Sequence, residues 1–158
     1  MPLFKRKVEP YDLYARGNAK GLIKLLDDKQ RDDRAQICHF LGQVGDPGAI
    51  RPLLAQLDDP ANLVRSASLE ALGYFGARFN LGRENTNRIG EMLLNDGDFM
   101  VRIKAARALA AIAEYASKND LWLMQGDAEE YLIDAYKKRE DAGVYELLEE
   151  LLSKLDVL

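Results

Sequence analysis

Residues 59–76 read DPANLVRSASLEALGYFG, and this stretch decides the fold because two other parts of the chain repeat its pattern. Arg65 aligns with Arg34 and Arg102. In each copy a leucine follows the arginine by seven residues, and an aspartate precedes it by six. The aligned leucines are Leu41, Leu72 and Leu109, and the aligned aspartates are Asp28, Asp59 and Asp96. Such internal repetition is typical of a stack of similar units.

Each copy has the apolar period of two successive helices. In the copy that begins at Arg34, the apolar residues Phe40, Leu41 and Val44 lie three, four and seven positions after Ile37, which indicates an amphipathic helix. A second apolar stripe follows Asp46 and Pro47, a pair that suits the start of another helix. We therefore expect each unit to be two antiparallel helices. The small residues Gly42, Gly73 and Ala110 would let paired helices approach closely.

Residues 17–115 resemble HEAT repeats of the short, Gly-Asp-rich type that was first associated with phycobilisome-lyase-like proteins. The resemblance is close over Arg34–Asp46 and Val64–Gly76. It is looser over Val101–Ala113, where alanines replace both glycines. It implies an all-α fold, a right-handed α-α superhelix (an armadillo/HEAT-like solenoid) of about four helical pairs plus a C-terminal capping helix.

The resemblance also implies a role for the repeated charges. In that family the aspartate after the second helix and the arginine that follows it interact in a ladder along the stack. The corresponding residues here are Asp28 and Arg34, Asp59 and Arg65, and Asp96 and Arg102. The carboxylate would bind loop amides while the guanidinium bridges neighbouring units. We therefore interpret these six residues as structural, not catalytic.

Two segments depart from the shortest repeat. Successive arginines are 31 and then 37 residues apart, and the excess falls around 77–87. A second extension falls around 115–127. Insertions in repeat proteins gather on one edge of the stack and are often used for binding. Longer first helices would give the same spacing, so both interpretations stay open.

Six residues are candidates for binding a partner protein: Arg51, Tyr74, Arg83, Arg88, Glu91 and Trp122. The four charged ones belong to second helices or to the first insertion, and they would line the inner face of the stack. Tyr74 is expected at the margin of its helix. Trp122 is an aromatic residue of the kind that anchors binding patches. For Trp122 we nevertheless favour the alternative in which it folds back over the end of the hydrophobic core.

The charge distribution bears on the partner. We divide the chain into a basic tail, residues 1–7, and one HEAT-like repeat domain, residues 8–158. Residues 1–79 contain 12 basic and 10 acidic side chains, whereas residues 80–158 contain 10 and 16. A partner with a basic patch would be steered to the acidic half. A merely soluble cap would have the same composition, and a homo-oligomer is an open alternative.

Composition argues against several classes of function. One cysteine and one histidine cannot complete a four-ligand zinc site, and the net charge of −4 argues against a nucleic-acid partner. The longest run without charge is the 11 residues of 35–45, well short of the roughly 20 that a membrane helix needs. The first residues also lack the apolar region of a secretory signal. We expect a cytoplasmic protein without stable membrane association.

The sequence contains none of the common catalytic motifs for phosphate loops, serine hydrolases or metalloproteases. The HEAT-like deoxyhypusine hydroxylases use His-Glu metal ligands, but here the single His39 is followed by Phe40. Cys38 falls at a core position, and we interpret it as a small buried hydrophobe. We therefore expect no catalytic residue, no metal site and no cofactor, so the protein is not expected to be an enzyme.

These observations favour a non-enzymatic scaffold or adaptor that binds another protein. The alternative that the resemblance implies is a subunit of, or a chaperone for, a lyase-type enzyme acting on an open-chain tetrapyrrole or its carrier protein. A DNA-scanning glycosylase of HEAT-like fold would need a basic concave face, which the acidic C-terminal half opposes.

Overall fold

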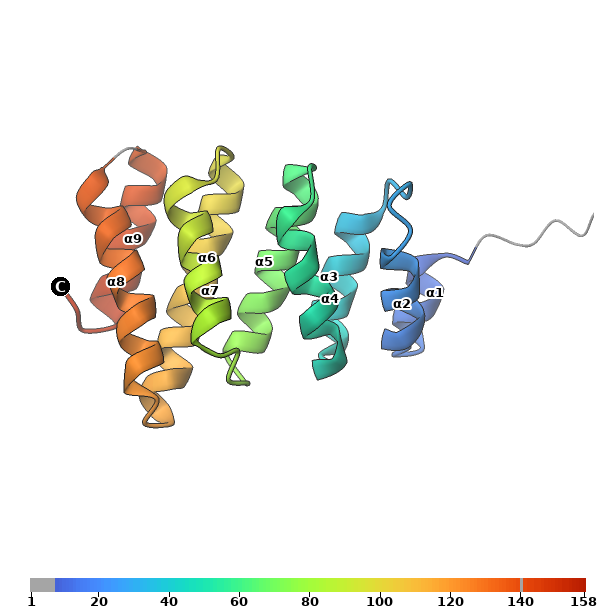
Figure 1. Cartoon of the computed structure of the whole chain (residues 1–158), viewed down its shortest axis with the longest axis horizontal. Coiled ribbons are helices and arrows are strands. Elements are labelled where there is room, and N and C mark those ends of the chain that lie inside the picture. The colour runs from blue at the N-terminus through green and yellow to red at the C-terminus, as the bar shows by residue number, and fades with distance from the viewer. Residues whose placement is uncertain (1–7, 140) are drawn as a thin grey trace, which may run out of the picture.

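The computed structural model describes residues 8–139 and 141–158, and the regular elements of these residues are all helical (Figure 1). The helices are α1 (Pro10–Ala15), α2 (Ala19–Leu26), α3 (Arg34–Val44), α4 (Ile50–Ala55), α5 (Asn62–Gly76), α6 (Arg83–Asn95), α7 (Phe99–Lys118), α8 (Trp122–Lys138) and α9 (Ala142–Lys154). Two 3-10 turns, η1 (Pro47–Ala49) and η2 (Gln56–Asp58), flank α4. The expected basic tail, residues 1–7, lies outside the described residues.

The helices alternate between two layers. Neighbours in the first layer, α1, α3, α5, α7 and α9, pack side by side, and α6 packs on α8 in the second layer. Figure 1 shows α2, α4, α6 and α8 in front of the first layer, with α1 and α9 at opposite ends of the stack. The described chain thus forms four helical pairs followed by α9. The predicted all-α, HEAT/armadillo-like solenoid is confirmed.

Polar side chains cap the N-terminus of several helices. Each accepts a hydrogen bond from a backbone N–H that has no partner within the first turn. The Asp46 carboxylate accepts from Gly48 N at 2.8 Å, with Pro47 in the first turn, as predicted. This turn is the 3-10 element η1, which leads directly into α4. Asn18 caps α2 and Asp98 caps α7 in the same way.

The core lies between the two layers and follows the repeat. The aligned leucines Leu41, Leu72 and Leu109 are fully buried. A Cβ atom at Gly42 would lie 2.8 Å from the Cβ of Ala71, so α3 and α5 approach too closely for a larger residue there. At Gly73 the nearest atom would be 3.4 Å away, which is an ordinary contact. The close approach predicted for the small residues therefore holds strictly at Gly42.

The two extensions have different structures. The first supplies the 77–82 connection between α5 and α6 and the first turn of α6. The second lies in the last turn of α7, the short 119–121 connection and the first turns of α8, so longer helices account for it. Both connections lie at the lower edge of the stack in Figure 1, opposite the edge that carries the turns before α3, α5, α7 and α9.

Candidate protein interface

The repeated arginines bind the aspartate of the next unit. Arg34 donates two hydrogen bonds to the Asp59 carboxylate, at 3.0 and 3.2 Å. Arg65 donates two to Asp96, at 2.8 and 2.9 Å. Arg102 donates one to a carboxylate that the sequence analysis did not include, that of Asp141, at 2.9 Å. We call these three ion pairs the arginine ladder; they connect α3, α5, α7 and α9 at the upper edge in Figure 1.

The aspartate and the arginine that lie six residues apart in the sequence are not the two partners of one ion pair. Arg65 donates to the backbone carbonyl of Asp59 at 3.0 Å, and Arg102 donates to that of Asp96 at 2.8 Å. Each of these arginines therefore binds the backbone of its own turn and the carboxylate of the next turn. The spacing visible in the sequence reports the backbone contact, whereas the ion pair crosses to the neighbouring unit.

The turn aspartates share one local contact. Each accepts a hydrogen bond from the backbone N–H two residues later, at 2.9 to 3.1 Å. The four are Asp28, Asp59, Asp96 and Asp141. Asp28 thus has the turn contact, but the ion pairs among the described residues do not include it. Asp141 does not align with the other aspartates in the sequence. It lies four residues before Tyr145, the counterpart of the arginines, whereas the other aspartates lie six residues before their arginines.

Burial within the ladder decreases along the chain. The side chain of Asp59 is 2% exposed, that of Asp96 10% and that of Asp141 30%. Burial alone would raise the pKa of Asp59, but hydrogen bonds from Arg34 and from Ala61 N–H, together with the positive charge of Arg34, outweigh it. The pKa of Asp59 is therefore below its usual value, and its carboxylate is charged at neutral pH.

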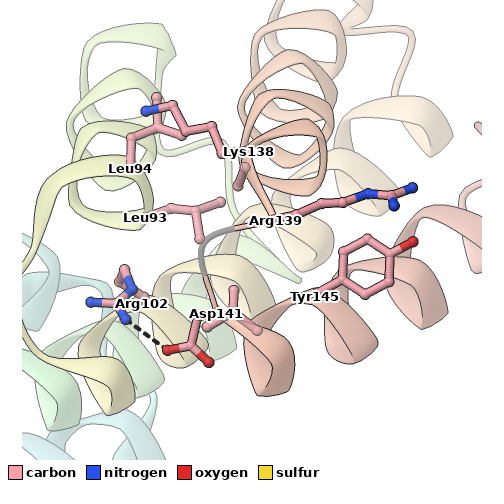
Figure 2. A pocket seen from close by; sticks show the side chains of 9 residues that line it. Leu93, Leu94, Arg102, Lys138, Arg139, Asp141 and Tyr145 are labelled. Atoms are coloured by element: carbon pink, nitrogen blue, oxygen red, sulfur yellow. Dashed lines mark hydrogen bonds and ion pairs between the residues drawn. The ribbon is translucent and has the colours of Figure 1, made fainter.

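Figure 2 shows the last rung of the ladder beneath the connection between α8 and α9. Arg102 and Asp141 are in direct contact and line a small hollow together with Leu93. Arg139 has a left-handed backbone, with φ 50°, and its guanidinium lies 5.1 Å from the centre of the Tyr145 ring. The Arg102–Asp141 ion pair in this hollow completes the ladder.

The candidate binding residues are distributed over three places. Arg83, Arg88 and Glu91 lie on α6, and Arg51 is exposed on α4, so these four share the second layer. Tyr74 lies on α5 in the first layer, 43% exposed, and its hydroxyl donates to Glu70 at 3.4 Å. Trp122 begins α8 at the lower edge in Figure 1. The structure therefore does not gather the six into one site.

A groove between α6 and α8 carries most of the negative charge on the second layer. We define this acidic groove by its lining residues, Asn87, Glu91, Leu94, Asp127, Glu130, Tyr131 and Asp134. Arg83 holds one of these carboxylates, that of Asp127, with two hydrogen bonds at 2.6 and 2.9 Å. This contact lowers the pKa of Asp127. Glu91 was among the binding residues predicted from the sequence, whereas the three α8 carboxylates were not.

Tyr131 lines the acidic groove. It packs against Gly90, where a Cβ atom would overlap its ring. Its hydroxyl donates to the Glu91 carboxylate at 3.2 Å. Burial raises the pKa of Tyr131, and the hydrogen bond and negative charge of Glu91 raise it further. Gly90 and Tyr131 could have been noticed in the sequence only as a small residue and an aromatic one on different helices.

The preferred prediction for Trp122 is wrong, because its side chain is 71% exposed. The core positions at the start of α8 are Met124, Ala128 and Leu132, at helical spacing, and Met124 fills the place expected for the indole. Trp122 instead borders a hollow that both extensions line. We call it the Trp122 hollow and define it by Asn80, Gly82, Arg83, Asp120, Leu121, Trp122, Leu123 and Met124.

The environment of Cys38 and the arrangement of the metal-binding residue types bear on catalysis. Cys38 is buried, as predicted, and Ser68 Oγ donates to its sulfur at 3.4 Å. Burial raises the pKa of the Cys38 thiol to about 11, so the reactive thiolate is scarce at neutral pH. Within residues 8–139 and 141–158, no group of three His, Cys, Asp or Glu is placed to hold a metal ion. Nor is any helix of these residues long and apolar enough to cross a membrane.

Residues 19–79 match the family model of HEAT repeats. A search of curated proteins found no match to the chain. The matched segment includes α2, α3, α4 and α5, and with them the Arg34–Asp59 rung. The same arginine contacts recur beyond it, in α7 and α9. The family match and the stacked helical pairs together support a HEAT-repeat protein.

Proposed function

We propose that this protein is a non-catalytic adaptor that binds another protein through its second layer of helices. HEAT repeats generally mediate protein-protein interaction, and a rigid stack presents an extended surface for it. The observation that carries the proposal is the acidic groove between α6 and α8. It brings four carboxylates together in one groove, an arrangement that a general solubility cap would not need.

The charge of the groove defines the partner's chemistry. Arg83 already binds Asp127 with two hydrogen bonds. Glu130 and Asp134 line the same groove and are exposed. A basic surface of a partner would gain from these charges and would be steered toward them before contact. A phosphate-rich ligand would be repelled by the same carboxylates.

Tyr74 supplies an internal control for this proposal. It lies in the first layer, between hollows on either side of α5, whereas the groove lies in the second layer. A compact partner that binds the groove would not reach Tyr74. Tyr74→Ala is therefore expected to leave groove binding unchanged.

The experiment is affinity capture from the native host with three forms of the full chain. The wild type is compared with the groove variant Glu130→Gln/Asp134→Asn and with the control variant Glu146→Gln/Glu149→Gln, which removes two exposed charges from α9. A protein that the wild type and the control capture, and the groove variant loses, is the expected result. Recovery of no protein, or equal recovery by all three forms, would contradict the adaptor.

Two further proposals accompany this function. Because successive units pack on one another from α1 to α9, we propose that residues 8–158 form one domain, which limited proteolysis would test. We also propose a cytoplasmic location, which microscopy of the tagged chain would test. The phycobilisome-lyase-like subtype and its tetrapyrrole alternative stay predictions from resemblance. An unchanged visible spectrum on titration with a bilin would end that alternative.

A further inference from the structure

The Trp122 hollow and the acidic groove meet along α8. Arg83 lines the Trp122 hollow, and its guanidinium binds Asp127, which lines the acidic groove. The two distances, 2.6 and 2.9 Å, make this a close bidentate ion pair. The two hollows are therefore neighbouring parts of one surface, and this pair connects them.

Four of the seven α8 residues that line this surface form one stripe. Leu123, Asp127, Glu130 and Asp134 follow one another at offsets of four, three and four. Such offsets place side chains on one face of a helix. The stripe runs from an apolar end to an acidic end and is about 16 Å long, at the rise of an α-helix. About five residues of an extended chain would cover that length.

The apolar end is exposed although the core is complete without it. Trp122 is 71% and Leu123 47% exposed, while the neighbouring Met124 is buried. Exposed aromatic and aliphatic side chains beside a hollow are the usual anchors of protein interfaces. Both chain extensions contribute to this end, through Asn80 and Gly82 from one and Asp120 and Leu121 from the other.

We propose that the Trp122 hollow and the acidic groove form one docking site for a short basic segment of a partner protein, with an apolar side chain against Trp122 and lysines or arginines along the groove. The proposal rests on the adaptor function and adds the position of the site and the chemistry of its occupant. The segment binds as an extended or helical peptide whose charges match the carboxylates of Glu130 and Asp134.

Charge complementarity favours this occupant over others. The groove has four carboxylates, those of Glu91, Asp127, Glu130 and Asp134, and one of them is held by Arg83. A second copy is the alternative occupant, because residues 3–7 of this chain read LFKRK, two apolar and three basic residues. The stack carries α1 and α8 near opposite ends, so such a contact would join two molecules head to tail (Figure 1).

The test begins with the full chain and a random display library of peptides of about 12 residues, long enough to cover the stripe. Enriched peptides are expected to contain an apolar residue within about five positions of two or more lysines or arginines. Each is then titrated into the protein while the fluorescence of Trp122, the single tryptophan, is recorded. Burial of the indole is expected to shift its emission to shorter wavelength.

Two variants and two controls locate the peptide. Trp122→Ala is expected to weaken binding at least about tenfold, measured by anisotropy of labelled peptide. Glu130→Gln/Asp134→Asn is expected to weaken it about three- to tenfold and to reduce its salt dependence. Leu63→Ala, which truncates another exposed residue, and Glu146→Gln/Glu149→Gln are expected to leave binding within about twofold of the wild type.

Several results would overturn the docking site. They are a selection without enrichment, enrichment of neutral or acidic peptides, and peptides that bind Trp122→Ala as tightly as the wild type. Self-association that requires both residues 1–7 and Trp122, seen by sedimentation, would replace the partner segment with a second copy. If a host partner is captured through Glu130 and Asp134 but binds Trp122→Ala normally, the adaptor stands and this docking site falls. If selected peptides bind here and capture fails, the adaptor falls instead.

Discussion

The two edges of the stack use the repeat in opposite ways. At the edge of the arginine ladder, the turns before α5, α7 and α9 each present an aspartate to the arginine of the preceding unit. At the opposite edge, the connections after α5 and α7 differ in length and form the Trp122 hollow. Repetition therefore marks the contacts that hold the units together, and departure from it marks the surface particular to this chain.

The two edges differ because the ladder side chains are buried and hydrogen-bonded, whereas the side chains at the other edge are exposed. Asp59 is nearly inaccessible, and its oxygens bind Arg34 and Ala61 N–H. Removing one member of such a pair leaves the other desolvated without its partner. Trp122 and Leu123, in contrast, are exposed, and the neighbouring core position is filled by Met124, so their removal leaves no buried group without a partner. Substitution at the ladder should change stability, and substitution at the other edge should change binding.

The largest effect within the arginine ladder is expected for Asp59→Ala. It leaves the guanidinium of Arg34, half-buried between two units, without its carboxylate. We expect the free energy of unfolding to fall by about 3 kcal/mol, measured by urea denaturation. Asp58→Ala is the matched control, because this adjacent carboxylate is 82% exposed and pairs with Arg88. A loss for Asp59→Ala no larger than the roughly 0.5 kcal/mol expected for the control would break the comparison.

Graded burial along the ladder predicts a graded series of arginine variants. Arg65→Ala removes two hydrogen bonds to Asp96 and should cost about 2 kcal/mol. Arg102→Ala removes one bond to the more exposed Asp141 and should cost about 1 kcal/mol. Arg107→Ala, an exposed position on α7, should cost less than about 0.5 kcal/mol. Equal melting temperatures for Arg65→Ala and Arg107→Ala would show that the ladder does not stabilise the stack.

Acid should weaken the Arg34–Asp59 rung. Because the pKa of Asp59 is lower in the folded state than its usual value, its contribution is complete above that usual value and is lost as the pH falls through the folded pKa. The stability difference between wild type and Asp59→Ala should therefore narrow below about pH 4. Thermal melts between about pH 3 and pH 7 measure it. A difference that stays constant down to pH 3 would mean that this carboxylate does not provide the stabilisation.

The smallest effect on stability is expected at the opposite edge. Trp122→Ala truncates a side chain that is 71% exposed and should change the free energy of unfolding by less than about 0.5 kcal/mol. Met124→Ala, two residues away in the core, should cost about 2 to 4 kcal/mol. Urea denaturation of both variants gives the contrast. A larger loss for Trp122→Ala than for Met124→Ala would restore the prediction that the indole covers the core.

The periodic features could be predicted from the sequence because they depend on neighbours a few residues apart. The apolar period places Leu41, Leu72 and Leu109 in the core, where the structure has them. The turn before each first helix is also local, since each aspartate binds an N–H two residues later. The prediction for Trp122 was wrong, although the same periodicity would have given the correct answer, because Met124, Ala128 and Leu132 continue the core stripe of α8 without it.

What the sequence determined by itself is the repeated unit: its two helices, its turn, its core positions and the residues that recur at fixed spacing. Tertiary structure decided which unit each residue meets. It directs Arg102 to Asp141, brings the two extensions together at Trp122, and seats Tyr131 on Gly90 beside Glu91. These contacts depend on how far one unit is shifted and rotated from the next. That geometry arises from the packing of whole helices, so no short stretch of sequence encodes it.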